Sequence, residues 1–385
     1  MTDIGKANLA ALIKQAQTEK KPLEIIGHGS KRFLGGTPLG HQLSTTSYAG
    51  ITKYEPSELY ITARAGTTIV EVEEVLAKQR QYLPFEPPRI YLRQTGEQGG
   101  ETFQGAGTIG GMIATALSGP ASLSQGGIRD FVLGVSMINA NGEELHFGGQ
   151  VMKNVAGYDV SRLLTGSMGV LGVISEVSLK VLPKPQATTT VSIDSTPSLA
   201  IENINIWLGQ PLPINASVIE PEQQVIRLSG SPANVKRGVQ VLAEQVKPAN
   251  LSIWQAEQAL TYWQSLRDQQ HHFFQDAMFK IDQTLPQPMN LWRITLPSTT
   301  GYINWEGEQL VEKGGGQRWL LTSLPTESLR QEVAKYGGFA TLYRSADKSP
   351  GVFNPLPKPN ARWQKALQDT FDPYRIFNRG RMYPD

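Results

Sequence analysis

The sequence predicts an α+β fold built from short strands and short helices in layers. Segments typical of strands interleave with amphipathic segments typical of helices in the N-terminal part of the chain. Asn141-Gly142 separates two strand-like segments, 131–140 and 143–147, and predicts a type I′ antiparallel hairpin. A glycine-rich stretch, 105–180, contains this hairpin and would let the backbone approach a ligand closely.

The composition is that of a globular protein long enough for two domains. The chain has 385 residues, 39% of them hydrophobic and 18% charged, with a formal net charge of +2. No basic run favours nucleic acid or an anionic membrane. The lack of cysteine excludes disulfides, thiolate-bound iron–sulfur clusters and a cysteinyl flavin link within this chain. With no signal-peptide pattern and no run of ~18 apolar residues, we expect a cytoplasmic location, with membrane association only through partners.

The first elements lead to a small glycine-containing loop. Residues 6–18 have apolar side chains at helical spacing, and residues 23–26 read as a short strand. The loop 27–31 (GHGSK) follows that strand. Its main-chain N–H groups could form a nest for a pyrophosphate, with a hydroxyl from Ser30 and a charge from Lys31. An ordinary glycine-rich turn explains the same residues.

The next elements continue the α+β pattern. Strands are expected at 43–47 and 59–66, and Thr67 or Thr68 could cap a helix over 69–79. Short strands that alternate with short helices favour a mixed layer domain.

The glycine cluster 105–110 matches the G-x-G-x-x-G pattern of a dinucleotide-binding turn, and Asp130 follows about twenty residues later. Its context contradicts that interpretation. A polar loop, 96–101, precedes the cluster where an apolar parallel strand is required, and Asp130 precedes a strand when it should end one. The hairpin that follows is antiparallel, so no βαβ unit forms.

Thr108 stands at an N-cap position before the helix expected over 109–114. Free N–H groups at that helix start would favour a phosphate. A helical turn is expected at 159–164, and residues 173–182 alternate as a strand with one buried face.

The second half of the chain carries fewer functional signals. Strands are expected at 187–193, 224–228, 290–296 and 318–322, and helices at 235–245, 255–280 and 326–336. Gly314-Gly315-Gly316 is expected at a hairpin tip. His271 and His272 are adjacent in an expected helix, where they would point roughly 100° apart, so we expect no metal site there.

Three segments, 105–120, 126–149 and 151–185, resemble the FAD-binding subunits of bacterial glycolate oxidase (glycolate dehydrogenase). These proteins belong to the vanillyl-alcohol-oxidase/PCMH-type flavoprotein superfamily. The resemblance is continuous over about residues 21–185, and the C-terminal segment DPYRIFNRGR, 372–381, resembles the family's D-P-x-x-x-F-N-x-G-R signature. The two matches together are more specific than either one alone.

The resemblance implies a PCMH-type FAD-binding domain of two α+β subdomains over 1–186. An α+β cap domain is expected over 187–345, followed by a C-terminal tail, 346–385, that returns to the FAD domain. The residues that it implies at the flavin are Gly27, His28, Gly29, Ser30, Lys31, Gly105, Gly107, Thr108, Ile109, Gly110, Gly111, Ala114, Gly172, Val173 and Ile174.

Some histidine-containing loops of flavoproteins tether the ring covalently, but we expect non-covalent FAD here and treat His28 as a turn residue. Related 2-hydroxyacid dehydrogenases carry histidine-rich metal sites in the cap, which this sequence lacks, so we expect no metal. No catalytic base is evident. Arg129 and Tyr158 are the polar residues that we expect near the flavin, where an arginine could pair with a carboxylate substrate. Structural hydrogen bonding explains both residues equally well.

The function implied is that of an FAD-dependent oxidoreductase subunit that oxidises glycolate to glyoxylate. Its expected partners are a catalytic flavoprotein subunit and an iron–sulfur subunit, and its substrate a small 2-hydroxy acid. Two alternatives stay open: a non-catalytic assembly subunit with a degenerate flavin site, and a self-sufficient FAD-dependent oxidase of a sugar acid or lactone.

Overall fold

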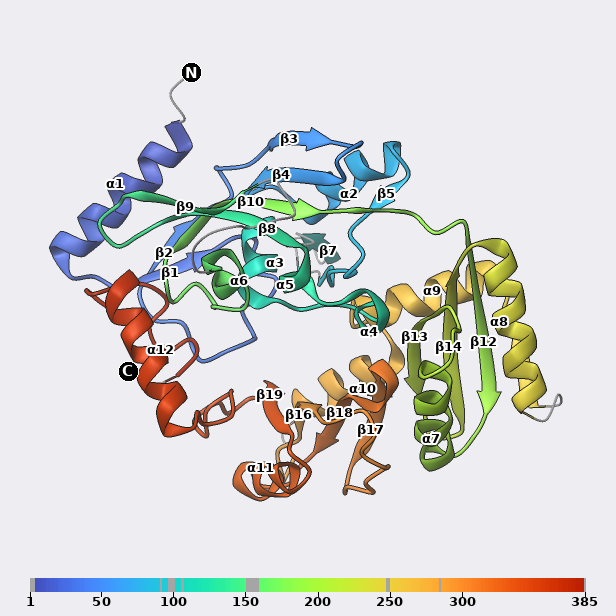
Figure 1. Ribbon diagram of the computed structural model, residues 1–385. Helices are drawn as coiled ribbons and strands as arrows, with labels where there is room; N and C mark the ends of the chain where they lie inside the picture. Colours follow the sequence, from blue (N-terminus) through green and yellow to red (C-terminus); the bar gives the residue numbers. More distant parts are fainter. Residues whose placement is uncertain are drawn as a thin grey trace. The chain divides into compact units, whose positions relative to one another are not determined.

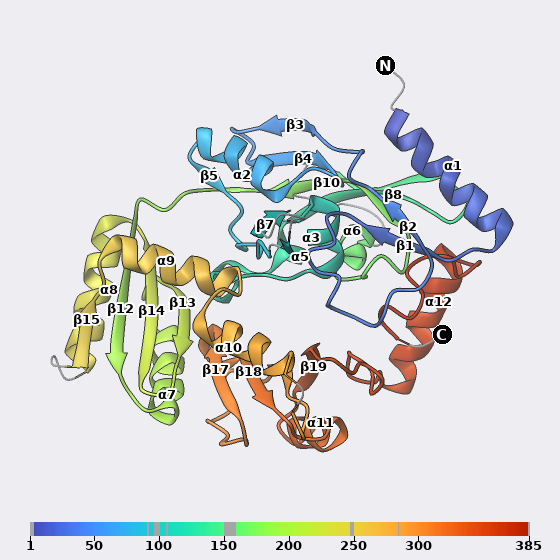
Figure 2. The ribbon, with the colours of Figure 1, turned by 180° about the vertical axis from the view of Figure 1, so that it is seen from behind.

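The computed structural model describes residues 4–90, 92–95, 101–104, 107–149, 159–246, 250–283 and 285–383 (Figure 1). The chain divides into two compact units. Unit 1 comprises residues 1–117, 127–183 and 355–385, and unit 2 comprises residues 118–126 and 184–354. Figure 2 shows the same elements from behind. No helix in the described ranges is both long enough and apolar enough to cross a membrane.

Unit 1 begins with helix α1 (Ile4–Glu19) and a parallel pair of strands, β1 (Leu23–Ile26) and β2 (His41–Ser44). Leu9 and Ile13 of α1 are buried in one cluster with Leu23 and Leu43 of the two strands. A spacing of four residues puts Leu9 and Ile13 on one face of the helix, and this explains why that face packs on the strands.

The main sheet of unit 1 has five strands in the order β3-β4-β10-β8-β9. All its pairings are antiparallel. The strands are β3 (Ile51–Glu55), β4 (Tyr60–Arg64), β8 (Val132–Ile138), β9 (Glu144–Gly148) and β10 (Val173–Lys180). Helices α2 (Ile69–Lys78) and α3 (Ile109–Thr115) bury Val72, Leu76, Met112 and Ile113 in the same core as this sheet. The expected α+β architecture is confirmed.

The hairpin between β8 and β9 is confirmed, but its expected two-residue type I′ turn is wrong. Ile138 pairs with Glu144, so the connection spans the residues from Asn139 to Glu143. Gly142 alone of the Asn141-Gly142 pair has positive φ, at 72°. The Asn139 side chain explains the longer loop, because its Oδ1 accepts hydrogen bonds from the N–H groups of Asn141 and Glu143.

Shorter elements complete unit 1. These are β5 (Gln81–Tyr82), β6 (Leu92–Thr95), β7 (Glu101–Gln104), α5 (Ile128–Phe131), α6 (Val160–Leu164), β11 (Leu182–Pro183) and α12 (Lys358–Phe371). After α12, the C-terminal segment returns to β1, where Phe377 forms a parallel bridge with Leu23. Residues 355–385 therefore group with unit 1.

Unit 2 is built on an eight-stranded sheet with the order β15-β12-β14-β13-β17-β18-β16-β19, in which the pairings are antiparallel. The strands are β12 (Ala187–Asp194), β13 (Ile214–Ile219), β14 (Gln223–Gly230), β15 (Leu251–Ile253), β16 (Asn290–Thr295), β17 (Glu308–Glu312), β18 (Gln317–Thr322) and β19 (Phe339–Arg344). Helices α7 (Pro197–Leu208) and α8 (Pro232–Gln245) pack on one half of the sheet, and α11 (Thr326–Lys335) packs on the other half.

The segment 118–126, which includes α4 (Ser122–Gln125), groups with unit 2, although it lies inside the range expected for the first domain. Ser124 explains this grouping: its hydroxyl donates to the main-chain oxygen of Asn215 in β13 at 3.3 Å. Leu123 packs on the apolar cluster of the same part of unit 2.

The single helix expected over 255–280 is wrong. The structure has α9 (Ala256–Arg267) and α10 (His272–Ile281), separated by a turn in which Gln269 has φ of 58°. His271 is the N-cap residue of α10, and its ring lies 4.0 Å from that of His272. In the described ranges, no group of three or more His, Cys, Asp or Glu side chains could hold a metal ion.

The turn before α10 helps to fix a buried carboxylate. Glu220 accepts hydrogen bonds from Tyr262 at 2.6 Å and Gln223 at 2.8 Å, and its Oε1 lies 3.3 Å from Nε2 of His271. Burial alone would raise the pKa of Glu220, but these partners outweigh burial and lower it to about 2, from an ordinary value of 4.5.

We therefore expect unit 2 to lose stability in acid. The stabilisation from Glu220 is fully present above pH 4.5 and is lost as the pH falls toward about 2. The loss should be about 3 kcal/mol of unfolding free energy. Urea unfolding followed by tryptophan fluorescence between pH 2 and pH 6 measures it, because six of the seven tryptophans lie in unit 2. Glu220→Gln should flatten this pH dependence, and an unchanged slope in that variant would contradict the assignment.

Candidate functional site

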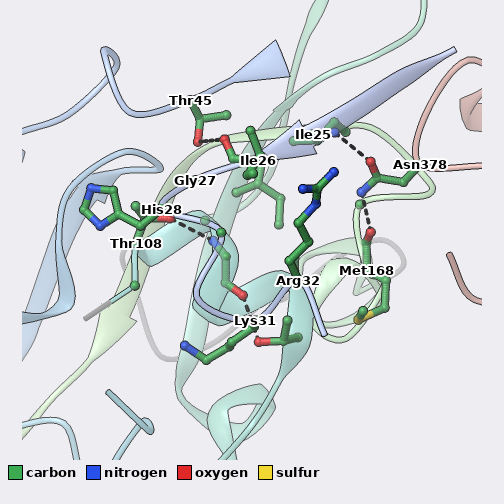
Figure 3. A pocket seen from close by; sticks show the side chains of 18 of the residues that line it. Ile25, Ile26, Gly27, His28, Lys31, Arg32, Thr45, Thr108, Met168 and Asn378 are labelled. Atoms are coloured by element: carbon green, nitrogen blue, oxygen red, sulfur yellow. Dashed lines mark hydrogen bonds between the residues drawn. The ribbon is translucent and has the colours of Figure 1, made fainter. Parts of the chain in front are cut away.

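A pocket in unit 1 brings together segments that are far apart in the sequence (Figure 3). Its walls are residues 24–32, the start of α3, residues around 168–174, and two residues of the C-terminal tail, Asn378 and Arg381. It encloses about 810 Å³ of empty space, part of it open to solvent. A pocket of this size can hold a large part of a nucleotide cofactor.

The loop after β1 provides unpaired main-chain donors in this pocket. Gly29 has φ of 71°, a conformation that glycine adopts without strain. Within the described part of the chain, the N–H groups of His28, Gly29 and Ser30 have no hydrogen-bond acceptor. Successive N–H groups of this kind form a concave anion site.

Charged side chains border the same loop. Lys31 is 8% exposed, and its Nζ lies 3.0 Å from the position that a Cβ on Gly107 would take. Glu24 is 5% exposed, and both of its oxygens accept hydrogen bonds from Arg32, at 2.7 Å and 2.8 Å. The Arg32 charge offsets that of Glu24, and the ammonium group of Lys31 adds a positive charge beside the loop, which favours an anion there.

The backbone of helix α3 lies close to the loop, but the N–H groups at the start of the helix already have acceptors within the protein. Thr108 caps the helix, and its Oγ1 accepts from the N–H of Gly111 at 3.3 Å. The N–H groups of Ile109 and Gly110 donate to the main-chain oxygens of Thr67 and Ala65, each at 2.9 Å. The expectation of free N–H groups at this helix start is therefore wrong.

Two glycines are required where the loop and the helix meet. A Cβ on Gly27 would lie 2.3 Å from Oγ1 of Thr108, and a Cβ on Gly110 would lie 2.8 Å from that of Ala65. Gly107 has φ of 94°, in the region that favours glycine. The loop and the helix can approach one another this closely only because these side chains are missing.

The C-terminal tail holds the pocket from one side. Asn378 accepts a hydrogen bond from the N–H of Ile25 and donates to the main-chain oxygen of Met168, both at 2.7 Å. Arg381 donates to the main-chain oxygens of Lys31, Arg32 and Gly36. These hydrogen bonds connect the tail to β1, to the loop after β1 and to the segment at Met168.

Asp372 shapes the tail itself. Its two carboxylate oxygens accept from the N–H groups of Ile376 and Phe377, at 3.1 Å and 2.8 Å. This turn positions Asn378, whose φ is 42°. The aspartate and the asparagine of the D-P-x-x-x-F-N-x-G-R segment therefore have distinct structural roles.

Most of the predicted site residues line the pocket. Those that do are Gly27, His28, Gly29, Ser30, Lys31, Gly107, Thr108, Gly110, Gly111, Ala114, Gly172 and Ile174. Ile109 and Val173 are not among the lining residues and are buried in the two apolar clusters of unit 1. Gly105 and Tyr158 lie outside the described residues. Arg129 is exposed on α5 and is not a lining residue.

Several lining residues were not predicted. They are Glu24, Ile25, Ile26, Arg32, Thr45, Thr115, Met168, Gly169, Asn378 and Arg381. The tail signature was a usable signal for Asn378 and Arg381, because it contains both residues. Nothing in the spacing of the others indicated that they face a pocket.

His28 has one notable feature. It lines the pocket, and its Nδ1 is buried with no hydrogen-bond partner among the described residues. A buried ring nitrogen without a partner is costly in a protein alone, which suits contact with a ligand.

Comparisons with known proteins agree with this geometry. Residues 6–148 match the family model "FAD binding domain". The chain is 39% identical to the glycolate oxidase subunit GlcE of Escherichia coli over 97% of this chain and 96% of that protein. It is 43% identical to the glycolate oxidase subunit GlcD of Bacillus subtilis over 22% of this chain and 18% of that protein.

More distant matches are consistent in fold. A D-lactate dehydrogenase of Archaeoglobus fulgidus is 30% identical over 48% of this chain and 39% of its own length. A solved structure of alkyldihydroxyacetonephosphate synthase superposes with a TM-score of 0.66 at 14% identity, covering 97% of this chain and 75% of the other. The structural likeness supports the fold alone.

Proposed function

The chain belongs to the family of the glycolate oxidase subunit GlcE, and on that premise we propose that it is the FAD-binding subunit of a glycolate-oxidising complex. FAD is the cofactor that the matched family model names. The reaction proposed for the complex is oxidation of glycolate to glyoxylate, with electrons passing to partner subunits.

The residues of the pocket fit FAD. The unpaired N–H groups of His28, Gly29 and Ser30 suit the two phosphates, and Lys31 adds a positive charge. The glycines at positions 27 and 107 let the loop and the start of α3 approach each other closely beside the space proposed for the dinucleotide. Apolar side chains of Ile25, Ile26 and Ile174, together with the slim surface of α3, suit a flat ring. The single observation that carries the proposal is this nest of unpaired donors in a pocket of the matched domain.

The chemistry of the proposal is divided between cofactor and protein. When bound, the flavin accepts the two electrons released as the C–H bond next to the hydroxyl of the substrate is oxidised. This chain holds the phosphates, orients the ring and excludes water from its face. No side chain of the pocket is assigned as a base, and Arg129 is not among the residues that line it.

The partners proposed are a second flavoprotein subunit, of the kind named GlcD, and an iron–sulfur subunit. A chain without cysteine cannot ligate an iron–sulfur cluster through thiolates, so a relay of that kind would have to come from another subunit. We propose non-covalent FAD and no link through His28.

Purification and spectroscopy test this proposal. The chain expressed alone should carry FAD, visible as flavin absorbance, and acid precipitation should release the flavin into the supernatant. Co-expression with the two proposed partners should give glycolate-dependent dye reduction. A folded, colourless chain that takes up no added FAD would overturn the proposal in favour of an assembly subunit. Bleaching of the flavin by a sugar acid and not by glycolate would instead indicate a self-sufficient oxidase of another substrate.

A further inference from the structure

One face of the sheet in unit 2 carries charged side chains where a core would be apolar. Residues paired across antiparallel strands point to the same side, and Arg293 of β16 pairs with Trp319 of β18 and Thr341 of β19. Two positions further along, Gln317 of β18 pairs with Glu312 of β17. The register therefore gathers an arginine, a carboxylate, an amide and a hydroxyl on one face.

The opposite face of the same strands has an ordinary core. Trp292, Ile294, Leu320 and Leu342 are almost fully buried there and pack with Leu329 and Val333 of α11. The two faces of the sheet therefore differ in composition. An apolar core on one side stabilises the sheet, and the polar residues on the other side need another explanation.

The charges on the polar face are not balanced. The Glu312 carboxylate is 6% exposed and accepts hydrogen bonds from Gln317 at 2.8 Å and from the indole N–H of Trp319. Arg293 is half-buried, and no hydrogen bond or ion pair joins its guanidinium to any described residue. The ring of Tyr343 lies beside the guanidinium, with the ring centroid 6.0 Å from the guanidinium carbon.

Lys313, the residue directly after Glu312, is a second cation in this part of unit 2. It follows β17 in the turn Lys313–Gly315, and its φ of 54° is unusual for a residue with a side chain. Its Nζ donates to the main-chain oxygen of Ser118 at 3.3 Å. Burial lowers the pKa of Lys313 to about 8, the charge of Glu312 opposes that change, and the charge of Arg293 adds to it. The charges of Glu312 and Arg293 therefore both act on Lys313.

The charge of Glu312 acts on both Arg293 and Lys313, although it forms no ion pair with either, so these three side chains together carry one net positive charge in a partly buried place. An isolated charge of this kind is unfavourable unless an anion is bound. An arginine fork matches a carboxylate with two parallel hydrogen bonds, and a lysine adds a point charge.

We propose that Arg293 and Lys313 bind the carboxylate group of a small 2-hydroxy acid, with Thr341 as a neighbouring hydroxyl. The inference rests on the proposed function, because it takes the substrate class from there. It adds the place in this chain where the acid is recognised. The site lies wholly within unit 2 and uses none of the residues of the FAD pocket.

Binding and kinetics of matched variants test the site. Arg293→Gln removes the charge and keeps a polar side chain, and Arg293→Lys keeps the charge and loses the fork. Arg237→Gln is the control, because Arg237 is an exposed cation of the same unit, in a surface pair with Glu244. Each variant is purified with FAD bound, and glycolate binding is followed by the tryptophan fluorescence of unit 2, to which the neighbouring Trp319 contributes.

We expect the Kd for glycolate to rise at least tenfold in Arg293→Gln, to recover in part in Arg293→Lys, and to stay unchanged in Arg237→Gln. In the assembled complex, Arg293→Gln should raise KM for glycolate more than it lowers kcat. Lys313→Gln should have the same direction of effect and serves as the second variant if Arg293→Gln does not fold.

Two outcomes would contradict the proposed carboxylate site and leave the proposed function unaffected. One is equal glycolate affinity in Arg293→Gln, Lys313→Gln and Arg237→Gln. The other is a chain that keeps its FAD, supports glycolate oxidation in the complex, and shows no dependence of KM on either cation. Loss of FAD from the unmutated chain would instead contradict the proposed function.

Discussion

Replacing Arg381 with methionine is expected to lower the free energy of unfolding by about 3 kcal/mol and to weaken FAD binding at least tenfold. Arg381 is 7% exposed and donates to three main-chain oxygens, at 2.7 Å for Gly36, 2.9 Å for Arg32 and 3.3 Å for Lys31. Methionine fills part of the space but leaves these buried acceptors without donors. The loop that carries the unpaired N–H groups would then lose its support.

Urea unfolding and titration of the apoprotein with FAD measure the two effects. Arg362→Met is the matched control, because Arg362 is exposed on α12 and does not line the pocket. It should change the unfolding free energy by less than about 0.5 kcal/mol. If Arg381→Met unfolds like the control and retains its flavin, the tail does not support the loop as we describe.

Gly27→Ala is expected to raise the Kd for FAD by roughly 5- to 150-fold, the range that corresponds to overpacking by about 1–3 kcal/mol. The added Cβ would lie 2.3 Å from Oγ1 and 3.0 Å from Cγ2 of Thr108. Thr108 is fixed as the cap of α3, so the loop has to move away from the helix, and the phosphate site would lose its shape.

Gly301→Ala is the control for this change. Gly301 has no heavy atom within 4 Å of its hypothetical Cβ and lacks a positive φ. It should bind FAD as the unmutated chain does, as measured by the quenching of flavin fluorescence. A second variant, Gly27→Ala with Thr108→Ser, removes the Cγ2 contact and should recover part of the affinity. An unchanged Kd in Gly27→Ala would show that the contact between the loop and α3 does not shape the cofactor site.

The elements of unit 1 were predictable because their signals are local. The apolar spacing in α1, the alternation in β10 and the caps Thr68 and Thr108 depend on residues within one or two turns of each other. The hairpin turn was predicted wrongly for a related reason. The side chain of Asn139 accepts two main-chain hydrogen bonds and extends the loop, and the Asn-Gly pair alone does not reveal that competition.

The site was predictable only in part. The loop 27–31 and α3 stood out by their glycines, which are needed wherever backbones approach closely. The donors at the start of α3 were expected to be free, yet Ala65 and Thr67, more than forty residues away, accept two of them. Spacing along the chain carries no information about such partners, because they are brought together only by sheet packing.

The sequence by itself determined the α+β class, the two glycine-bearing segments and the family resemblance, because each depends on short-range patterns or on similarity along the chain. The tertiary structure alone decided that Asn378 bonds to β1 and Arg381 to the loop after it, each about 350 residues away along the chain. It also decided that Arg293 and Glu312 lie on one face of the sheet of unit 2, since strand register, and not sequence spacing, sets which side chains share a face.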